Sequence, residues 1–230
     1  MEIRMSEILI VEDQKDLARL LGMFIRKAGF TADCVSTGEE ALSYLQNSSP
    51  KLMLLDVNLP GMDGFAVCRR VRKQGSLPIL MLSARIEKED QLSGFLLGAD
   101  DYIEKPVDLD ILIAKIKAVL QRIYGEADEA SIIEAGDLTV DTAAHKVYKN
   151  GNLLNLNVKE YELLVLLVKN RGKVLHKDYL FNEIWGADSF SENQTLTVHI
   201  KRLRDKIEDY PKEPEHIKTI WGVGYCYEEV

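Results

Sequence analysis

The chain has 230 residues, of which 46% are hydrophobic, and this composition is typical of a folded protein and excludes a disordered one. The formal net charge of −8 at pH 7 is shared by both halves, which excludes a protein that coats nucleic acid through bulk positive charge. The sequence shows no run of membrane-spanning length and no signal-peptide pattern. The cysteines, Cys34, Cys68 and Cys226, are scattered and predict reduced thiols. We therefore expect two globular domains in a cytoplasmic protein without a membrane segment.

The first half alternates short hydrophobic runs with segments of helical period. Strands are predicted at 7–11, 31–35, 52–56, 78–82 and 101–103. Helices are predicted at 14–28, from 36 onward, and at 65–73, 87–97 and 108–122. Five strands alternating with five helices indicate an α/β fold with a doubly wound, five-stranded parallel sheet, like that of flavodoxin.

Chemically active side chains follow the ends of four of these strands: Glu12 and Asp13, then Asp56, Ser83 and Lys105. The carboxyl ends of parallel strands meet at one edge of a sheet, beside its topological switch point. Three carboxylates form an oxygen-rich, negative hollow that suits Mg²⁺. Asp56 can act as a nucleophile toward phosphorus while the metal, the ammonium and the hydroxyl neutralise the transferring group. The pattern predicts a site of phosphoryl transfer.

Residues 1–122 resemble the receiver domain of two-component response regulators. The resemblance is carried by Val-Glu12-Asp13, Leu-Leu-Asp56-Val-Asn-Leu-Pro-Gly-Met-Asp-Gly64, Leu-Ser83-Ala-Arg and Gly-Ala-Asp-Asp-Tyr102-Ile-Glu-Lys105-Pro106. It implies that a sensor histidine kinase phosphorylates Asp56, and that Mg²⁺ is bound by Glu12, Asp13, Asp56 and the backbone carbonyl of Asn58. It also implies Ser83 and Tyr102 as switch residues, Lys105 as the partner of the phosphoryl group, and a cis peptide bond before Pro106.

One other class of protein uses similar chemistry. Phosphatases of the haloacid dehalogenase type also use a strand-end Asp and Mg²⁺. They need a second acid two residues after the nucleophile, where this chain has Asn58, and no substrate-capping insertion is apparent. The sequence therefore favours a phosphoacceptor protein, and we expect that the chain is not an enzyme.

The second half has a different pattern. Residues 122–131 are polar and aperiodic, and they predict a linker between domains at 1–121 and 132–230. Short strand-like pieces follow, divided by a hairpin signal at 149–152. A helix is then predicted from Asn157 to Gly172, with Asn157 and Glu160 spaced as a capping box. Further helices are predicted at 177–185 and at 192–208, before two final strands within 217–227. Three helices followed by a hairpin indicate an α+β winged helix.

The third of these helices is rich in basic residues. One face is apolar and predicts core: Leu196, Ile200, Leu203 and Ile207. The opposite face carries Gln194, Val198, Lys201 and Asp205, flanked by Thr197, Arg202 and Arg204. Taken alone, such a helix is more typical of a solvated charged face. Its place after a helix–turn–helix pattern favours a helix that lies in the major groove of DNA.

Residues 132–230 resemble the effector domain of OmpR/PhoB-type transcription factors. The motifs are Leu-Asn-Val-Lys-Glu-Tyr-Glu-Leu-Leu, Thr195-Leu-Thr-Val-His-Ile-Lys-Arg-Leu-Arg204-Asp-Lys-Ile and Ile-Trp-Gly-Val-Gly-Tyr225. The resemblance implies groove contacts by Val198 and Arg202, DNA-backbone contacts by Thr195, His199 and Lys201, and further contacts by Thr197, Arg204, Lys218 and Trp221. Trp221 stands where the family has a wing Arg, and Thr197 where it often has Asp.

The resemblance further implies a homodimer that forms on phosphorylation, with promoter DNA and RNA polymerase as partners. The dimer face would include two candidate ion pairs, Asp101 with Lys115 and Asp100 with Arg122. A third pair is lost, because Gln91 and Ile111 stand where charged residues are usual. Leu92 and Phe95, with Ile111, would supply an apolar centre. The alternative is a regulator that binds DNA independently of phosphorylation, which the intact set of acids disfavours.

Overall fold

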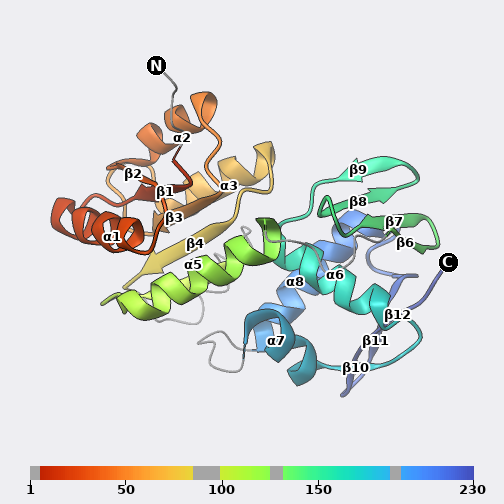
Figure 1. Ribbon diagram of the computed structural model, residues 1–230. Helices are drawn as coiled ribbons and strands as arrows, with labels where there is room; N and C mark the ends of the chain where they lie inside the picture. The colour runs from red at the N-terminus through yellow and green to blue at the C-terminus, as the bar shows by residue number, and fades with distance from the viewer. Residues whose placement is uncertain (1–5, 85–98, 125–131, 187–192) are drawn as a thin grey trace. The chain divides into compact units, whose positions relative to one another are not determined.

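The computed structural model in Figure 1 describes residues 6–84, 99–124, 132–186 and 193–230. The chain divides into two compact units, Met1–Gly125 and Glu126–Val230. Within the described residues, no helix combines the length and the hydrophobicity that crossing a membrane requires.

The first unit contains a five-stranded parallel sheet in the order β2-β1-β3-β4-β5. The strands are β1 (Ile8–Val11), β2 (Ala32–Val35), β3 (Leu52–Asp56), β4 (Ile79–Ser83) and β5 (Asp101–Glu104). Every residue of β1, β3 and β4 is buried. A sheet covered on both faces requires such strands, which explains their unbroken hydrophobic sequence and confirms the predicted sheet.

Helices cover the two faces of this sheet. They are α1 (Lys15–Lys27), α2 (Gly38–Asn47), α3 (Gly64–Gln74) and α5 (Leu109–Tyr124). The helices α1 and α5 pack together on one face, and α2 and α3 pack on the other (Figure 1). The predicted helix at 87–97 lies outside the described residues.

The end of α5 differs from the prediction. The helix was predicted to end at residue 122, but residues 123 and 124, which the sequence assigns to the linker, continue it. Ile123 packs against the hydrophobic core of the first unit, so burial of its side chain extends the helix. Residues 125–131 lie outside the described part of the chain.

The second unit begins with a four-stranded antiparallel sheet in the order β6-β7-β8-β9. The strands are β6 (Ile132–Ala135), β7 (Leu138–Asp141), β8 (Lys146–Lys149) and β9 (Asn152–Leu154). Asn150 and Gly151 join the last two strands with φ of 50° and 79°. Asn-Gly tolerates these positive φ values, and the predicted hairpin is confirmed.

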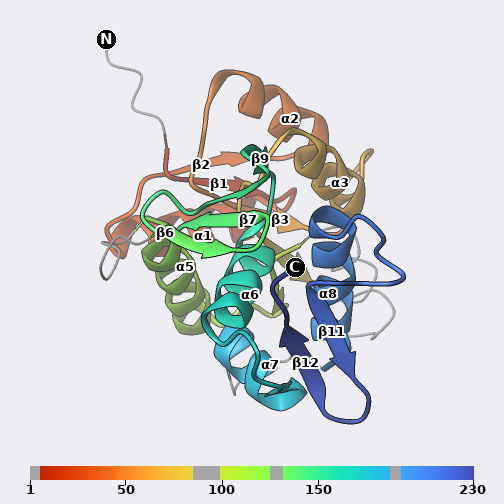
Figure 2. The same ribbon diagram turned by 90° about the vertical axis from the view of Figure 1, so that its right-hand side faces the viewer.

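Three helices follow: α6 (Val158–Lys169), α7 (Lys177–Trp185) and α8 (Asn193–Ile207). A second sheet has the order β10-β12-β11, with β10 (Leu175–His176), β11 (Ile217–Ile220) and β12 (Gly224–Tyr227). The hairpin of β11 and β12 is the wing (Figure 2). The sequence did not predict β10. It pairs closely with Gly224, where a Cβ would lie 1.8 Å from the Leu175 carbonyl oxygen. These elements confirm the predicted winged helix.

Candidate functional site

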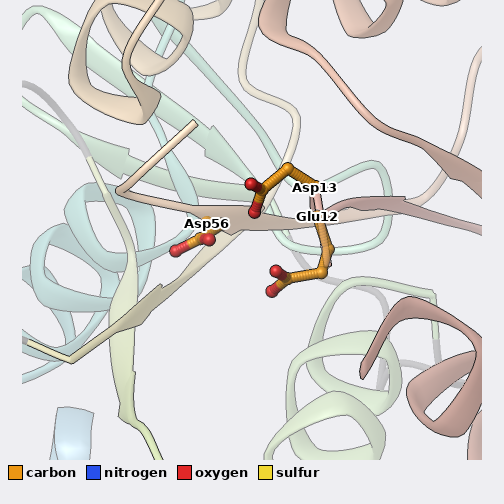
Figure 3. A group of neighbouring side chains, drawn as sticks. All are labelled: Glu12, Asp13 and Asp56. Atoms are coloured by element: carbon orange, nitrogen blue, oxygen red, sulfur yellow. The ribbon is translucent and has the colours of Figure 1, made fainter. Parts of the chain in front are cut away.

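Three carboxylates meet at the carboxyl edge of the parallel sheet. Glu12 and Asp13 follow β1, and Asp56 ends the neighbouring strand β3 (Figure 3). One carboxylate oxygen from each lies within 4.8 Å of the other two. Glu12 and Asp56 are buried, whereas Asp13 is exposed. The sheet thus brings together the acids that the sequence predicted, with one of them accessible to solvent.

Lys105 reaches this cluster from the end of β5. Its Nζ lies 2.9 Å from Asp56 Oδ2 and 2.7 Å from Glu12 Oε2. Its backbone N–H donates to the carbonyl of Ser83, 2.8 Å away, which holds the chain after β5 against the end of β4. The Lys105–Pro106 peptide bond is cis, as the resemblance implied.

The cluster carries more negative than positive charge. Burial raises the pKa of Glu12, and the charge of Asp56 raises it further, against the hydrogen bond from Lys105. Burial opposes the charge of Lys105, but hydrogen bonds to Glu12 and Asp56 outweigh that effect and raise its pKa. One ammonium therefore faces three acids, and an acidic pocket of oxygen ligands with excess negative charge suits a hard divalent cation.

The carboxylate of Asp56 is held in a fixed orientation. Its Oδ1 accepts from the backbone N–H of Asn58 at 3.2 Å, while its Oδ2 faces Lys105. The first residue of helix α3, Gly64, lies in close contact with this strand end: a Cβ at Gly64 would lie only 2.1 Å from the Asp56 carbonyl oxygen. Gly64 thus permits the helix to start here. Ser83 at the end of β4 and Tyr102 in β5 are both buried.

Both acids of the predicted dimer-face ion pairs have a cation partner within their own chain. Asp101 pairs with Lys115 of the same chain, and Ile111 is 40% exposed. Asp100 is fully buried, and its Oδ2 lies 2.6 Å from Nη2 of Arg72. The Asp100 carboxylate therefore compensates a buried cation of its own chain. Its pairing with Arg122 stays a prediction, because the side chain of Arg122 lies outside the described residues.

The other predicted dimer residues are not tested by the structure. Gln91, Leu92 and Phe95 lie outside the described residues. The same holds for the side chain of Arg122.

The predicted DNA face of α8 separates into outward and inward positions. Thr197 and Lys201 are exposed, and Val198 is partly exposed. Of the basic residues between 201 and 206 of the described helix, Lys201 alone has neither an ion pair nor a hydrogen bond through its side chain. The others bind groups of their own chain.

Arg204 ties α8 to the wing. Its Nε lies 3.0 Å from the carbonyl of Ile217, and its Nη2 donates to Oγ1 of Thr219 at 2.8 Å. The guanidinium also lies 5.8 Å from the ring centroid of Tyr225. Arg204, which the sequence predicted to contact DNA, is thus already hydrogen-bonded to the wing of its own chain.

His199 and Thr195 fill the core instead of the DNA face. His199 is fully buried, with Nδ1 2.9 Å from the Thr195 carbonyl and its ring edge-on to Trp185 at 5.0 Å. Burial lowers the pKa of His199 to about 4, so the ring is neutral at pH 7. Thr195 is 3% exposed. The structure therefore does not bear out DNA-backbone contacts by these two side chains, because both are buried on the flank of α8 that continues into Arg202 and Lys206.

The two predicted wing residues differ in exposure. The Nζ of Lys218 donates to the carbonyl of Pro214 at 2.9 Å, and the residue is partly exposed. Trp221 is 90% exposed in the turn between β11 and β12. The wing therefore presents a large apolar side chain to its surroundings.

Sequence reasoning missed the role of Glu160. It was expected only as the partner of Asn157 in a capping box, which the structure confirms. Glu160 is also fully buried beneath α8, where Oε1 lies 2.9 Å from Nε of Arg202 and Oε2 pairs with Lys206. The local pattern signals the cap, but no local pattern signals partners so distant in the chain.

Two family models match the chain. Residues 8–117 match the response regulator receiver domain, and residues 151–227 match the C-terminal domain of transcriptional regulatory proteins. The sensory transduction protein RegX3 of Mycolicibacterium smegmatis is 42% identical over 227 residues, covering 97% of this chain and 100% of that protein. The regulatory protein VanR of Enterococcus faecium is 38% identical over 230 residues, covering 97% and 99%.

Solved structures agree with this assignment. The response regulator DrrB, an OmpR/PhoB homologue from Thermotoga maritima, is 32% identical with a TM-score of 0.52, covering 97% of this chain and 99% of that one. A RitR mutant is 29% identical with a TM-score of 0.77 and the same coverage. Members of the matched families are regulators and not enzymes. The chain therefore belongs to the OmpR/PhoB-type two-component response regulators, which act with a cognate histidine kinase and bind DNA to regulate transcription.

Proposed function

We propose that Asp56 is the phosphoacceptor and that Glu12, Asp13, Asp56 and the backbone carbonyl of Asn58 bind Mg²⁺. The observation that carries this proposal is the meeting of three carboxylates and Lys105 at one edge of the sheet. Mg²⁺ uses few carboxylates and keeps several waters, so an exposed Asp13 beside two buried acids fits its needs.

In the proposed reaction an oxygen of Asp56 attacks the phosphorus of a phosphohistidine on the kinase. The bond from phosphorus to the imidazole nitrogen breaks, and an acyl phosphate forms on Asp56. Bound Mg²⁺ supplies positive charge to the phosphoryl oxygens. Lys105 already lies 2.9 Å from Asp56, so its ammonium is placed to contact the new phosphoryl group. Ser83 and Tyr102 are proposed to respond to that group.

The second part of the proposal concerns DNA and assembly. We propose that Thr197, Val198, Lys201 and Arg202 of α8 meet the major groove of promoter DNA, with Lys218 and Trp221 at the wing. Phosphorylation would favour a homodimer whose face includes Ile111, and the bound dimer would contact RNA polymerase. The exposure of Thr197 and Lys201 on one stripe of α8 supports this assignment.

The phosphoacceptor is tested with acetyl phosphate and Mg²⁺. Intact-mass measurement should show addition of one phosphoryl group that is stable in acid and labile in base. Asp56→Asn should abolish the addition and preserve the fold, because the two side chains are nearly isosteric. Asp63→Asn is the matched control, since Asp63 caps α3 and Asn also caps helices. Full phosphorylation of the Asp56→Asn variant would show that another residue is the phosphoacceptor.

The role of phosphorylation is tested in the same samples. A phosphorylation-dependent regulator should bind its DNA more tightly, and scatter light as a dimer, after treatment with the phosphodonor. Equal affinity and equal mass before and after treatment would favour the alternative, a regulator that works without phosphorylation.

A further inference from the structure

Glu160 holds the inner flank of the DNA-binding helix. Its carboxylate is fully buried at the start of α6, with Oε1 2.9 Å from Nε of Arg202 and Oε2 bound to Lys206. Oε2 also accepts from the backbone N–H of Asn157 at 2.9 Å. Oε2 is therefore hydrogen-bonded, whereas Oε1 has an ion pair with Arg202 and no hydrogen bond among the described residues. The cap of α6 and the flank of α8 thus share one carboxylate.

The register of α8 explains which residues this carboxylate reaches. Arg202 and Lys206 are four residues apart and lie on one flank, with side chains 16% and 30% exposed. Val198 precedes Arg202 by one further turn and lies on the boundary of the outward stripe. The ion pair with Glu160 thus holds the guanidinium of Arg202, which lies one turn from Val198 at the boundary of the proposed DNA face.

The ion pairs also determine how much positive charge α8 offers. A carboxylate between Arg202 and Lys206 offsets much of their field, whereas Lys201 on the outward stripe has no such partner among the described residues. Burial opposes ionisation of Glu160, but the charges of Lys206 and Arg202 outweigh it and lower its pKa. The carboxylate is consequently ionised at pH 7.

We propose that Glu160 is a positioning residue for DNA recognition, which fixes the guanidinium of Arg202 in one orientation and withholds the charges of Arg202 and Lys206 from the phosphates of non-cognate DNA. This inference rests on the proposed placement of α8 in the major groove. Glu160 itself does not contact DNA. It raises selectivity in two ways. A guanidinium held by an ion pair discriminates better between bases, and a flank with one positive charge offset binds less tightly to any duplex.

The test uses the full chain with Glu160→Gln. Gln is nearly isosteric and its oxygen can still accept from the Asn157 N–H, so the capping box survives. Two probes are needed: a 30-base-pair duplex, a length of about three helical turns, selected by the unaltered chain from a random pool, and a scrambled duplex of the same composition. Affinity for each is measured by fluorescence anisotropy across a salt series.

We expect opposite changes on the two probes. Glu160→Gln should bind the selected duplex less well and the scrambled duplex better, so that their affinity ratio falls about tenfold, within the range of one base contact. On the scrambled duplex the slope of log affinity against log salt should steepen by about one, as expected for one further phosphate contact. A purely structural role would lower both affinities together.

Controls separate position from bulk charge. Glu162→Gln removes a neighbouring carboxylate of α6, which lies 3.0 Å from Nζ of Lys159, and alters the net charge equally. It should leave the affinity ratio unchanged. In a double-mutant cycle, Glu160→Gln should have little further effect on the ratio in an Arg202→Ala background.

A second variant keeps the test decisive if Glu160→Gln does not fold. Arg202→Lys retains the charge and an ion-pair partner for Glu160 but loses the planar head, so the affinity ratio should fall while the salt slope stays constant. An unchanged ratio in the folded Glu160→Gln variant, or in Arg202→Lys where Glu160→Gln is unfolded, would overturn the inference. Failure of the pool to yield any preferred duplex would instead overturn the proposed DNA-binding function, and this inference with it.

Discussion

The acidic cluster of the first unit and the basic inner flank of α8 handle charge in opposite ways. At the cluster, three carboxylates share one ammonium, Lys105, and excess negative charge remains for a metal ion. On α8, the carboxylate of Glu160 offsets one of the two positive charges of Arg202 and Lys206, while Lys201 has no ion-pair partner among the described residues. A predicted set of charged residues is thus available to a ligand only where its own chain fails to neutralise it.

The difference follows from how each set is positioned. Parallel strands deliver their end residues to one edge, so the receiver residues converge because of the topology of the sheet. A helix surface carries no such constraint, and Arg202, Arg204 and Lys206 turn toward the acids or carbonyls that their neighbours offer. Four predictions sharpen or break this contrast.

The largest effect is expected at the acidic cluster. Asp13→Ala removes the exposed carboxylate ligand and should abolish saturable Mg²⁺ binding in isothermal titration calorimetry. Asp16→Ala, in the first turn of α1, removes a nearby exposed acid and should leave Mg²⁺ affinity within about twofold. Equal losses in both variants would show that bulk negative charge, and not the cluster, attracts the ion.

The second prediction concerns the buried ring of His199. Its folded pKa is lowered to about 4, so its stabilising contribution is present above the unfolded value of 6.5 and is lost as pH falls toward 4. The loss should reach about 3 kcal/mol in the free energy of unfolding of the second unit. His199→Asn should flatten this pH dependence in urea titrations, whereas the exposed His176→Asn should not. A slope that persists in His199→Asn would place the titrating group elsewhere.

The third prediction compares neighbouring cations of α8. Arg202→Ala should weaken binding to the selected duplex by about 1–3 kcal/mol and leave the scrambled duplex nearly unaffected. Lys201→Ala should weaken both and reduce the salt slope by about one, because its exposed ammonium has no ion-pair partner in the described structure. If Lys201→Ala weakened only the selected duplex and Arg202→Ala weakened both, the assignment of Lys201 as outward and Arg202 as inward would be reversed.

The smallest effect is expected at the wing. Trp221→Arg adds a charge that a narrow minor groove attracts, so affinity should rise by less than about 1 kcal/mol and the salt slope should steepen. Trp221→Phe, which adds no charge, is the control. Affinity and slope that remain unchanged in Trp221→Arg would show that the wing stays away from the DNA.

The sequence predicts the five-stranded sheet, the capping box of α6, the bounds of α7 and the acidic cluster, because each depends on local pattern or on strand order. It does not predict that Asp100 is buried against Arg72, or that Glu160 holds Arg202. Both pairs join distant segments, and nothing in the local pattern of either partner identifies the other.

The same limit explains the error at His199. A polar residue on a basic helix resembles a DNA contact, and only the tertiary packing against Trp185 shows that the ring lies in the core. The missed strand β10 is two residues long, and it owes its pairing to the absence of a side chain at Gly224.

The two tryptophans give the second unit a built-in optical reporter. Trp185 is 7% exposed, packed between Phe181 and His199, whereas Trp221 is 90% exposed. Their fluorescence should therefore divide into a blue component from the core and a red component from the wing, distinguishable by iodide quenching. Protection of the red component from iodide would report that the wing is in contact with a partner. Loss of the blue component would report unfolding of the core. Binding and integrity can thus be followed in one cuvette without a label.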